Sequence, residues 1–282
     1  RIEWSPACVR EDTMTDKTDE PATTPSRGSG RPPATMERFV PDLVEHGAPV
    51  GGTPQTLETR LFAQLQVFTG CLATEPVVNA VRDSGLESVV YANLNDPRGV
   101  GVLLLSEVPT LFAEAGRALL AGPAFAGLTP MPDFTMLGRT YSSGREADLK
   151  DFLLHKVRRN ALDPAYPWGI WYPLRRLGAF NRLPRRDQGR ILMEHGMVGR
   201  AYGDLGLAVD IRLECHGLDR DDNEFVIGLI GPDLYPLSKL VKDMRGTVQT
   251  SEYMQDMGPF FVGRAIYQSP VPDSAKGDGT GY

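Results

Sequence analysis

The sequence predicts an α+β fold of two tandem ferredoxin-like repeats, each with the order βαββαβ, of the dimeric α+β barrel type. Two observations predict it. Segments with strand composition and segments with helical periodicity follow one another in the same order twice, and the second set repeats the first at an offset of about 110 residues. Each split βαβ unit places its helices on one face of an antiparallel sheet, so two such sheets can pair into one compact unit.

Residues 1–58 differ in composition from the rest of the chain. They are rich in Pro, Thr, Gly, Ser and charged residues, and so little apolar surface does not offset the entropy cost of ordering. We expect a tail that is disordered or wraps a partner. The first repeat then occupies residues 59–144. Its predicted elements are strand 61–70, helix 75–85, strands 87–95 and 99–107, helix 109–122 and strand 134–142.

A long connector, residues 145–167, separates the two repeats. It has helical character and contains His155, and connectors of this length within a compact domain are often functional. The second repeat is predicted at 168–270, followed by a flexible tail at 271–282. Its predicted elements are strand 168–176, helix 186–200, strands 207–217 and 224–231, helix 234–246 and strand 259–268.

Composition excludes several classes of protein. The chain has 282 residues, 41% of them hydrophobic, and no run of about 18 apolar residues, so we expect no membrane span. A formal net charge of −6 argues against a general nucleic-acid partner. The three cysteines are odd in number and lack CxxC spacing, which argues against a disulfide framework or a zinc knuckle and fits a cytoplasmic location.

The stretch 168–200 contains residue types that suit a metal or haem site. Tyr172 lies in the predicted strand, and His195 lies in the following helix, which Gly196 and Gly199 can close. A histidine in the last turn of a helix can present a ring nitrogen to iron or zinc. A helix cap or a hydrogen bond within the core is the commoner role of a lone histidine there. Residue type alone therefore leaves the role of His195 open.

Four segments carry a resemblance to a known family. They are WYPLRR at 171–176, MEHGMVGRAY at 193–202, LSKLVKDMRGT at 237–247 and GPFFVGR at 258–264. In this order they resemble the chlorite dismutase family of haem proteins, in particular its coproheme decarboxylase branch with a distal histidine. The resemblance covers roughly residues 59–270 and is strongest from Trp168 onward.

The resemblance implies roles for three residues. His195 matches the histidine of the family's EHG motif, which is the proximal iron ligand, and Tyr172 matches the tyrosine that becomes the radical intermediate in coproheme decarboxylation. One branch also has a distal histidine 17 residues before that tyrosine and its proximal histidine 23 residues after it; His155, Tyr172 and His195 have this spacing. We therefore expect His155 and Tyr172 to be catalytic and His195 to bind the metal.

Four further residues match positions that contact the porphyrin in the family. Arg245 matches an arginine of the final helix that contacts a propionate, and Thr250 matches a nearby hydroxyl contact. Arg176 stands where the family's YPMSK motif has its propionate-binding lysine, and Arg158 lies in the connector. The resemblance implies that these four bind the cofactor, and a solvated surface position is the alternative for each arginine.

Two positions depart from the family's pattern. Relatives commonly have a glutamate after the Met-Arg pair that accepts the second N–H of the proximal histidine. This chain has Gly246 to Thr250 there, and a neutral partner such as Gln249 would leave the imidazole with less imidazolate character. Chlorite-degrading relatives have an arginine 13 residues after the proximal histidine, where this chain has Ala208. Arg212 lies four residues further on the same strand face, so we do not expect efficient chlorite turnover.

The implied reaction is the peroxide-dependent oxidative decarboxylation of the propionates of Fe-coproporphyrin III (coproheme) to vinyls, which gives haem b. Hydrogen peroxide is the implied oxidant. Two alternatives stay open. One is a haem-dependent peroxidase or other haem oxidant of the same family, and the other is a haem-binding carrier or sensor without turnover, in which Tyr172 is only a core aromatic. The resemblance also implies a homopentamer and a coproporphyrin ferrochelatase partner.

Overall fold

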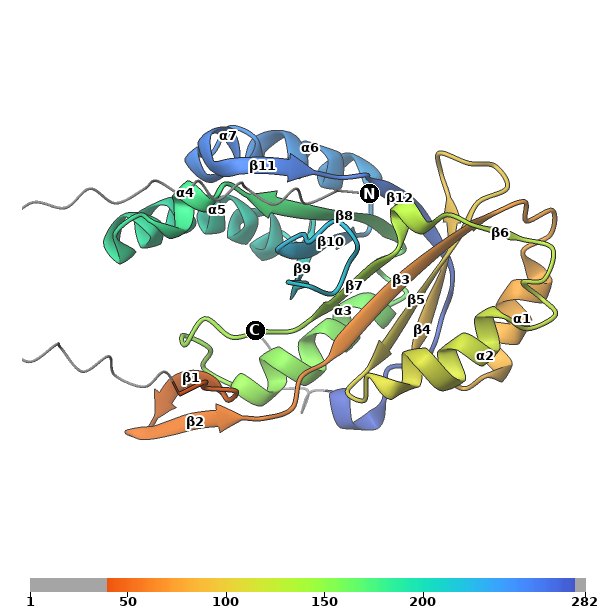
Figure 1. The fold of residues 1–282 in the computed structure, drawn as a ribbon, viewed down its shortest axis with the longest axis horizontal. Helices are drawn as coiled ribbons and strands as arrows, with labels where there is room; N and C mark the ends of the chain where they lie inside the picture. The colour runs from red at the N-terminus through yellow and green to blue at the C-terminus, as the bar shows by residue number, and fades with distance from the viewer. Residues whose placement is uncertain (1–39, 277–282) are drawn as a thin grey trace, which may run out of the picture. The chain divides into compact units, whose positions relative to one another are not determined.

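The computed structural model describes residues 40–276. Of the two units of the chain, Arg1–Asp42 and Leu43–Tyr282, the first is described only at residues 40–42. The second contains a closed ring of antiparallel strands in the order β10-β9-β7-β3-β5-β4-β12-β8, and β8 pairs back onto β10 (Figure 1). The predicted α+β barrel is thus confirmed. No helix in the described residues is long and apolar enough to cross a membrane.

The first repeat supplies four strands of the ring and packs helices on their outer face. Its elements are β3 (Phe62–Thr69), α1 (Glu75–Asp83), β4 (Ser88–Asn93), β5 (Val100–Ser106), η1 (Phe112–Gly116), α2 (Arg117–Leu120), β6 (Thr129–Pro130), η2 (Pro132–Phe134) and β7 (Met136–Arg139). Successive side chains of a strand point to opposite faces. Val102 and Leu104 therefore pack with Val81 of α1, whereas Leu103 and Leu105 face the interior of the ring.

The second repeat has the same order of elements. They are β8 (Trp168–Arg176), α4 (Gly178–Asn181), α5 (Arg185–Asp204), β9 (Val209–Glu214), β10 (Phe225–Gly231), α6 (Leu234–Met244), α7 (Val248–Tyr253), β11 (Met254–Met257) and β12 (Phe261–Gln268). The short elements α4, α7 and β11 add to the predicted order. Helices α5, α6 and α7 lie together, and α6 and α7 cover the side of β8 that faces away from β7 (Figure 1).

Helix α5 is longer than its glycines suggest. The sequence predicts an end near Gly196–Gly199, but the helix continues to Asp204, so His195 lies near its middle and not in its last turn. Each interior glycine costs about 1 kcal/mol of helix stability. Tyr202 offsets this cost, because its ring packs against the cluster below α6 and its hydroxyl donates to Asp243 Oδ2 at 2.7 Å. Tertiary contacts therefore decide where this helix ends.

Strand β8 separates the interior of the ring from the outer face below α6. Trp171 is buried in the interior and lies against Gly228, where a Cβ would come within 2.5 Å of the indole ring. Only glycine fits there. Tyr172, the next residue, belongs to the outer cluster with Leu229 and Leu240. The two neighbouring aromatic side chains therefore point to opposite sides of the sheet.

The connector forms the π-helical turn η3 (Asp151–His155) and helix α3 (Lys156–Leu162). Leu153, Leu154 and Val157 join the interior cluster that contains Trp171. Helix α3 therefore lies on the other side of the sheet from α6 and α7 (Figure 1).

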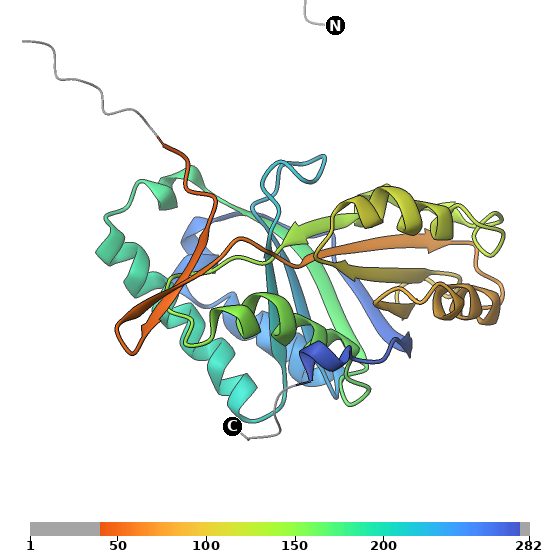
Figure 2. The same ribbon diagram turned by 90° about the horizontal axis from the view of Figure 1, so that it is seen from below.

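Part of the predicted N-terminal tail is folded. Strand β1 (Glu45–Val50) pairs with β2 (Thr53–Leu57), and the two form a hairpin that lies beside α3 (Figure 2). Gln55 joins the hairpin to the start of the connector, because its Nε2 donates to the carbonyls of Glu146 and Ala147 at 3.1 and 2.9 Å. The prediction of a disordered or partner-wrapping tail is wrong for these residues. Residues 1–39 lie outside the described part of the chain.

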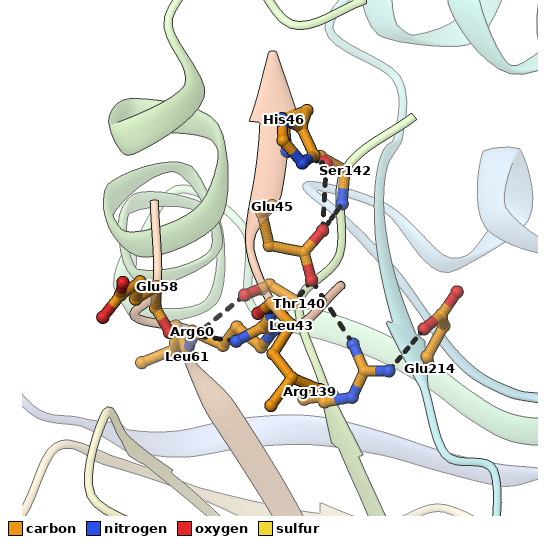
Figure 3. Close-up of polar contacts among 10 residues, drawn as sticks. All are labelled: Leu43, Glu45, His46, Glu58, Arg60, Leu61, Arg139, Thr140, Ser142 and Glu214. Atoms are coloured by element: carbon orange, nitrogen blue, oxygen red, sulfur yellow. Dashed lines mark hydrogen bonds and ion pairs between the residues drawn. The ribbon is translucent and has the colours of Figure 1, made fainter. Parts of the chain in front are cut away.

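Glu45 anchors this hairpin to the barrel (Figure 3). Its carboxylate accepts hydrogen bonds from Arg60 Nε at 2.7 Å and from the N–H and hydroxyl of Ser142 at 2.8 and 2.9 Å. Arg139 of β7 lies 3.6 Å from the same carboxylate and 2.8 Å from that of Glu214 in β9. The segment's own composition gives no sign of these contacts, because the partners come from other parts of the chain.

The C-terminal segment also begins in an ordered form. The turn η4 (Asp273–Ala275) packs against the connector, Ala275 is buried, and its carbonyl accepts a hydrogen bond from Arg159 Nη1 at 3.1 Å. The predicted flexible tail at 271–282 is therefore folded as far as this turn. Residues 277–282 are outside the described range.

Candidate functional site

The outer face of the second repeat, between the sheet and helices α5 and α6, carries the candidate site. Its surface is apolar. The buried residues are Ile170, Tyr172 and Leu174 of β8, Ala208 and Leu229 of the neighbouring strands, and Leu237 and Leu240 of α6. A flat hydrophobic ligand would find apolar contacts on both sides of this space.

His195 projects from α5 toward the corner between α6 and α7. Its Nδ1 lies 3.1 Å from the hydroxyl oxygen of Thr247, and the carboxylate of Glu194 accepts a hydrogen bond from the Val248 N–H at 3.1 Å. Two adjacent residues of α5 thus hold the start of α7, which limits rotation of the imidazole. Burial, and after it the charge of Arg212, lower the pKa of His195 below its ordinary value. The ring is therefore neutral near pH 7 and can serve as a metal ligand.

Tyr172 is buried on β8, with 6% of its surface exposed. Its ring stacks on that of Phe260, with centroids 4.4 Å apart and an interplanar angle of 23°. Burial, and after it the charge of Asp210, raise the pKa of Tyr172 far above its ordinary value, and the charge of Arg245 opposes this rise. The side chain is therefore a protonated phenol at neutral pH, held in an apolar and aromatic setting.

A cavity of about 360 Å³ opens beside the Tyr172–Phe260 pair. Its lining comprises Ile170, Ser238, Val241, Lys242, Arg245, Phe260 and Val262. Phe260 connects the cavity wall directly to Tyr172. Lys242 and Arg245 are exposed and make no ion pair within the described residues. These two cations can pair with the carboxylates of a ligand that occupies the cavity.

The structure brings together four of the predicted residues. His195 and Tyr172 are both influenced by the charge of Asp210, and Arg245 lines the cavity close enough to influence the pKa of Tyr172. Thr250 lies near His195, since its hydroxyl oxygen is 3.4 Å from that of Thr247. Strand β8, helix α5 and the α6–α7 corner therefore supply one site from segments that lie far apart in the sequence.

Arg158 does not join this site. Its side chain is 5% exposed on α3, its Nε donates to Glu87 at 2.6 Å, and its Nη1 donates to Glu107 at 2.8 Å and to the Leu154 carbonyl at 2.8 Å. The guanidinium thus fastens the connector to the first repeat, and the propionate contact of Arg158 stays a prediction of the resemblance.

His155 ends the π-helical turn η3 on the side of the sheet that carries α3. The distal role stays a prediction of the resemblance for His155, whose neighbours Leu153 and Leu154 are buried in the interior cluster. The charge of His155 acts on Asp151, whose pKa is lowered first by Arg159 and to a smaller extent by His155.

Arg176 lies at the far end of β8 and has partners within the protein. Its Nε donates to Glu224 at 2.8 Å, and its guanidinium lies over the rings of Phe180 and Phe225 at 4.6 and 4.9 Å. A ligand carboxylate would have to compete with Glu224 for this arginine. Arg245 and Lys242 are therefore better placed to meet a propionate.

Sequence reasoning missed two features of the site. The partner of His195 is Thr247, and the expected partner Gln249 is buried with its Oε1 unpaired among the described groups. Lys242 shares the cavity with Arg245. The only signal in the sequence was spacing, because Lys242 and Arg245 are three residues apart and lie on one side of a helix. The partner of a buried imidazole, which lies 52 residues away, cannot be read from such spacing.

The residues present fit a haem-type porphyrin. Porphyrin iron requires an axial ligand that a neutral imidazole can provide, and His195 offers one. The apolar surfaces suit the macrocycle, and Lys242 and Arg245 suit its carboxylates. Among the described residues no group of three or more His, Cys, Asp or Glu side chains could hold a bare metal ion.

Comparisons with known proteins agree with this geometry. Residues 133–266 match the sequence model of the chlorite dismutase family. A coproheme decarboxylase from Mycolicibacterium smegmatis is 30% identical over 95 residues, which cover 34% of this chain and 38% of that protein. The match thus spans well under half the length of this curated relative.

Solved structures show the same fold. A haem-binding protein from Thermus thermophilus superimposes with a TM-score of 0.59 at 22% identity, over 82% of this chain and 96% of that chain. Chlorite dismutase from Candidatus Nitrospira defluvii in complex with imidazole superimposes with a TM-score of 0.58 at 16% identity, over 76% and 93%. The region that contains His155, Tyr172, His195 and Arg245 is therefore a chlorite dismutase family domain.

Proposed function

We propose that the chain is a coproheme decarboxylase, which uses hydrogen peroxide to convert propionates of Fe-coproporphyrin III to vinyls and yields haem b. The observation that carries the proposal is the position of Tyr172: a buried phenol stacked on Phe260, which lines a cavity together with Lys242 and Arg245. A redox-active tyrosine must lie beside the propionates it acts on, and Arg245, a cation that can bind a propionate, is close enough to influence the pKa of Tyr172. The coproheme decarboxylase from Mycolicibacterium smegmatis supports the same reading.

Each residue has a chemical task in this proposal. His195 would hold the iron through a ring nitrogen, and Arg245 and Lys242 would pair with propionate carboxylates. Bound haem-type iron would supply the oxidising chemistry with peroxide. Tyr172 keeps its proton at neutral pH, since burial raises its pKa, and it can therefore give up a hydrogen atom instead of acting as a phenolate. The apolar lining around it excludes water from this step.

The overall reaction balances for each propionate. Each propionate, as a carboxylate, loses carbon dioxide, one proton and two electrons and becomes a vinyl group. One hydrogen peroxide takes up the two electrons, this proton and a second proton from solvent, and becomes two water molecules. The porphyrin is then the substrate as well as the group that carries the oxidation. A homopentamer, a ferrochelatase partner and a cytoplasmic location stay predictions of the resemblance and the composition.

A titration with coproheme followed by peroxide tests the proposal. We expect the wild-type protein to bind coproheme with a shift of its absorption bands, and mass spectrometry of the extracted porphyrin should show loss of two carboxyl groups after peroxide. The His195→Ala variant should lose the spectral signature of axial ligation while keeping its circular dichroism. Binding without mass change, together with peroxide-driven oxidation of an added phenol, would favour a peroxidase. Binding with neither reaction would favour a haem carrier or sensor.

A further inference from the structure

The hydrogen bonds around Thr247 determine which nitrogen of His195 carries the proton. A hydroxyl group has one proton to donate, and the Thr247 hydroxyl donates it to the carbonyl of Met244 at 2.8 Å. A carbonyl can only accept, so this proton is not available to the imidazole. The Thr247 oxygen can then only accept from His195, whose Nδ1 lies 3.1 Å away. Nδ1 is therefore protonated, and Nε2 carries the lone pair.

The backbone fixes the position of this hydroxyl. Thr247 is 3% exposed at the junction of α6 and α7, its N–H donates to the Met244 carbonyl at 3.1 Å, and its own carbonyl accepts from the Ser251 N–H at 2.9 Å. The bond from Val248 N–H to Glu194 ties the same junction to α5. The acceptor for Nδ1 is thus set by the fold before any ligand arrives.

No carboxylate competes for this position. Glu194 and Asp210 act on His195 only through their charge, and Glu194 already accepts from Val248. The neutral hydroxyl of Thr247 is the only hydrogen-bond partner of the His195 ring in the described part of the chain. A hydroxyl acceptor polarises the N–H bond less than a carboxylate, so the imidazole gives less electron density to whatever Nε2 binds.

We propose that Thr247 is a positioning residue that holds His195 in the Nδ1-protonated tautomer and makes it a neutral, weakly basic axial ligand. The inference rests on the proposed role of His195 as the iron ligand. It adds the hydrogen bond that orients the imidazole and influences the reduction potential of the iron. A neutral proximal ligand stabilises ferric iron less than an imidazolate does, so the reduction potential is higher than with a carboxylate partner.

The tautomer can be measured in the protein without any porphyrin. The nitrogen-15 chemical shifts of His195 should show a protonated Nδ1 and an unprotonated Nε2 in the wild type and in Thr247→Ser, which keeps the hydroxyl. Thr247→Val should lose this pattern. Ser251→Ala removes a hydroxyl one turn further along that does not reach His195, and it should leave the pattern unchanged. A protonated Nε2 in the wild type would overturn the inference whatever the variants do.

Reconstitution with coproheme gives a second readout. Thr247→Val should weaken binding about tenfold, as changes in the outer partners of metal ligands commonly do, and Thr247→Glu should lower the midpoint reduction potential of the iron. If both variants bind with unchanged affinity and potential, Thr247 does not adjust the ligand. If the wild type fails to bind coproheme at all, the proposed function fails, while the nitrogen-15 shifts still decide the tautomer.

Discussion

Tyr172 and Arg212 lie on one row of the sheet, because each pairs directly with Ile227 of the strand between them. Residues paired in this way point to the same face, so the phenol and the guanidinium share the outer face at about 10 Å, which is two strand spacings. Arg212 also lowers the pKa of His195, after burial. Its Nε forms an ion pair with Asp210 at 2.9 Å. The charged group aligned with the tyrosine therefore comes from β9 and not from the connector.

This alignment predicts which residue assists peroxide. Arg212→Ala should slow the reaction of the coproheme complex with peroxide by about tenfold or more, since removal of a charged donor costs about 1.5 to 3 kcal/mol. His155→Ala should change the rate less, because the residues beside His155 on the connector, Leu153 and Leu154, are packed in the interior cluster. Stopped-flow absorption measures both rates. A larger loss in His155→Ala, of about 10²-fold, would restore the distal histidine expected from the sequence and would require the connector to move.

The proposed role of the Tyr172 hydroxyl in decarboxylation can be tested by removing its oxygen. Tyr172→Phe keeps the ring stacked on Phe260, so coproheme affinity should stay within about threefold, while carbon dioxide release should stop. Mass spectrometry of the extracted porphyrin checks product formation, and absorption titration checks binding. Haem b made by the variant at the wild-type rate would contradict the role of the tyrosine.

Two arginines that looked alike in the sequence should respond differently to removal. Arg245→Ala should weaken coproheme binding about tenfold, because one charge-assisted contact to a propionate is lost, and should leave stability unchanged. Arg158→Ala should leave binding unchanged and lower the free energy of unfolding by about 2 to 3 kcal/mol, because Glu87 and Glu107 lose their buried partner. Urea unfolding and coproheme titration of both variants separate the two roles, and equal binding by Arg245→Ala would remove it from the site.

The protein should not sustain the conversion of chlorite to oxygen and chloride. Ala208 stands where chlorite-degrading relatives resemble one another in having an arginine, and it is 2% exposed in the apolar cluster. Arg212 is displaced along β9 by about 13 Å at ordinary strand rise. An oxygen electrode with added chlorite should show release that stops after few turnovers as the haem bleaches. Oxygen evolution that continues over many turnovers would mean that Arg212 replaces the missing arginine.

The hairpin should lose stability in acid through Glu45. Burial alone would raise the pKa of Glu45, but hydrogen bonds from Ser142 and Arg60 more than offset it, and the pKa lies below its ordinary value of 4.5. A carboxyl group with a lowered folded-state pKa stabilises the fold above its unfolded pKa, and this contribution disappears as pH falls through the folded value. The protection factors of the β1 and β2 amides against hydrogen exchange should therefore fall below pH 4.5 in the wild type. Glu45→Gln should exchange faster already at neutral pH and show a smaller acid dependence.

Much of the fold was predictable, because alternation in β5 and β8 and the helical period of α6 are local properties of the sequence. The hairpin at residues 45–57 was not, since its stability depends on Arg60 and on Ser142, which is 97 residues from Glu45. Within the candidate site, the motifs single out His195 and Tyr172, and the roles of both residues stay predictions. The ion pairs of Arg158 could not be predicted, because its two glutamate partners lie 71 and 51 residues away in the sequence.

The two strand pairings that join the repeats, β4–β12 and β7–β9, differ in length. Strand β12 pairs with β4 through five residue pairs, whereas β7 pairs with β9 only through Arg139 and Glu214. A local opening of the native state therefore costs least at β7–β9, with the β4–β12 ladder as the hinge. Such an opening would release the edge of β9 that carries Asp210 and Arg212 while β8, β10 and α6 stay packed. Strand β9, next to the site, thus lies where the barrel opens most easily, whereas Tyr172 lies on β8, which stays paired during such an opening.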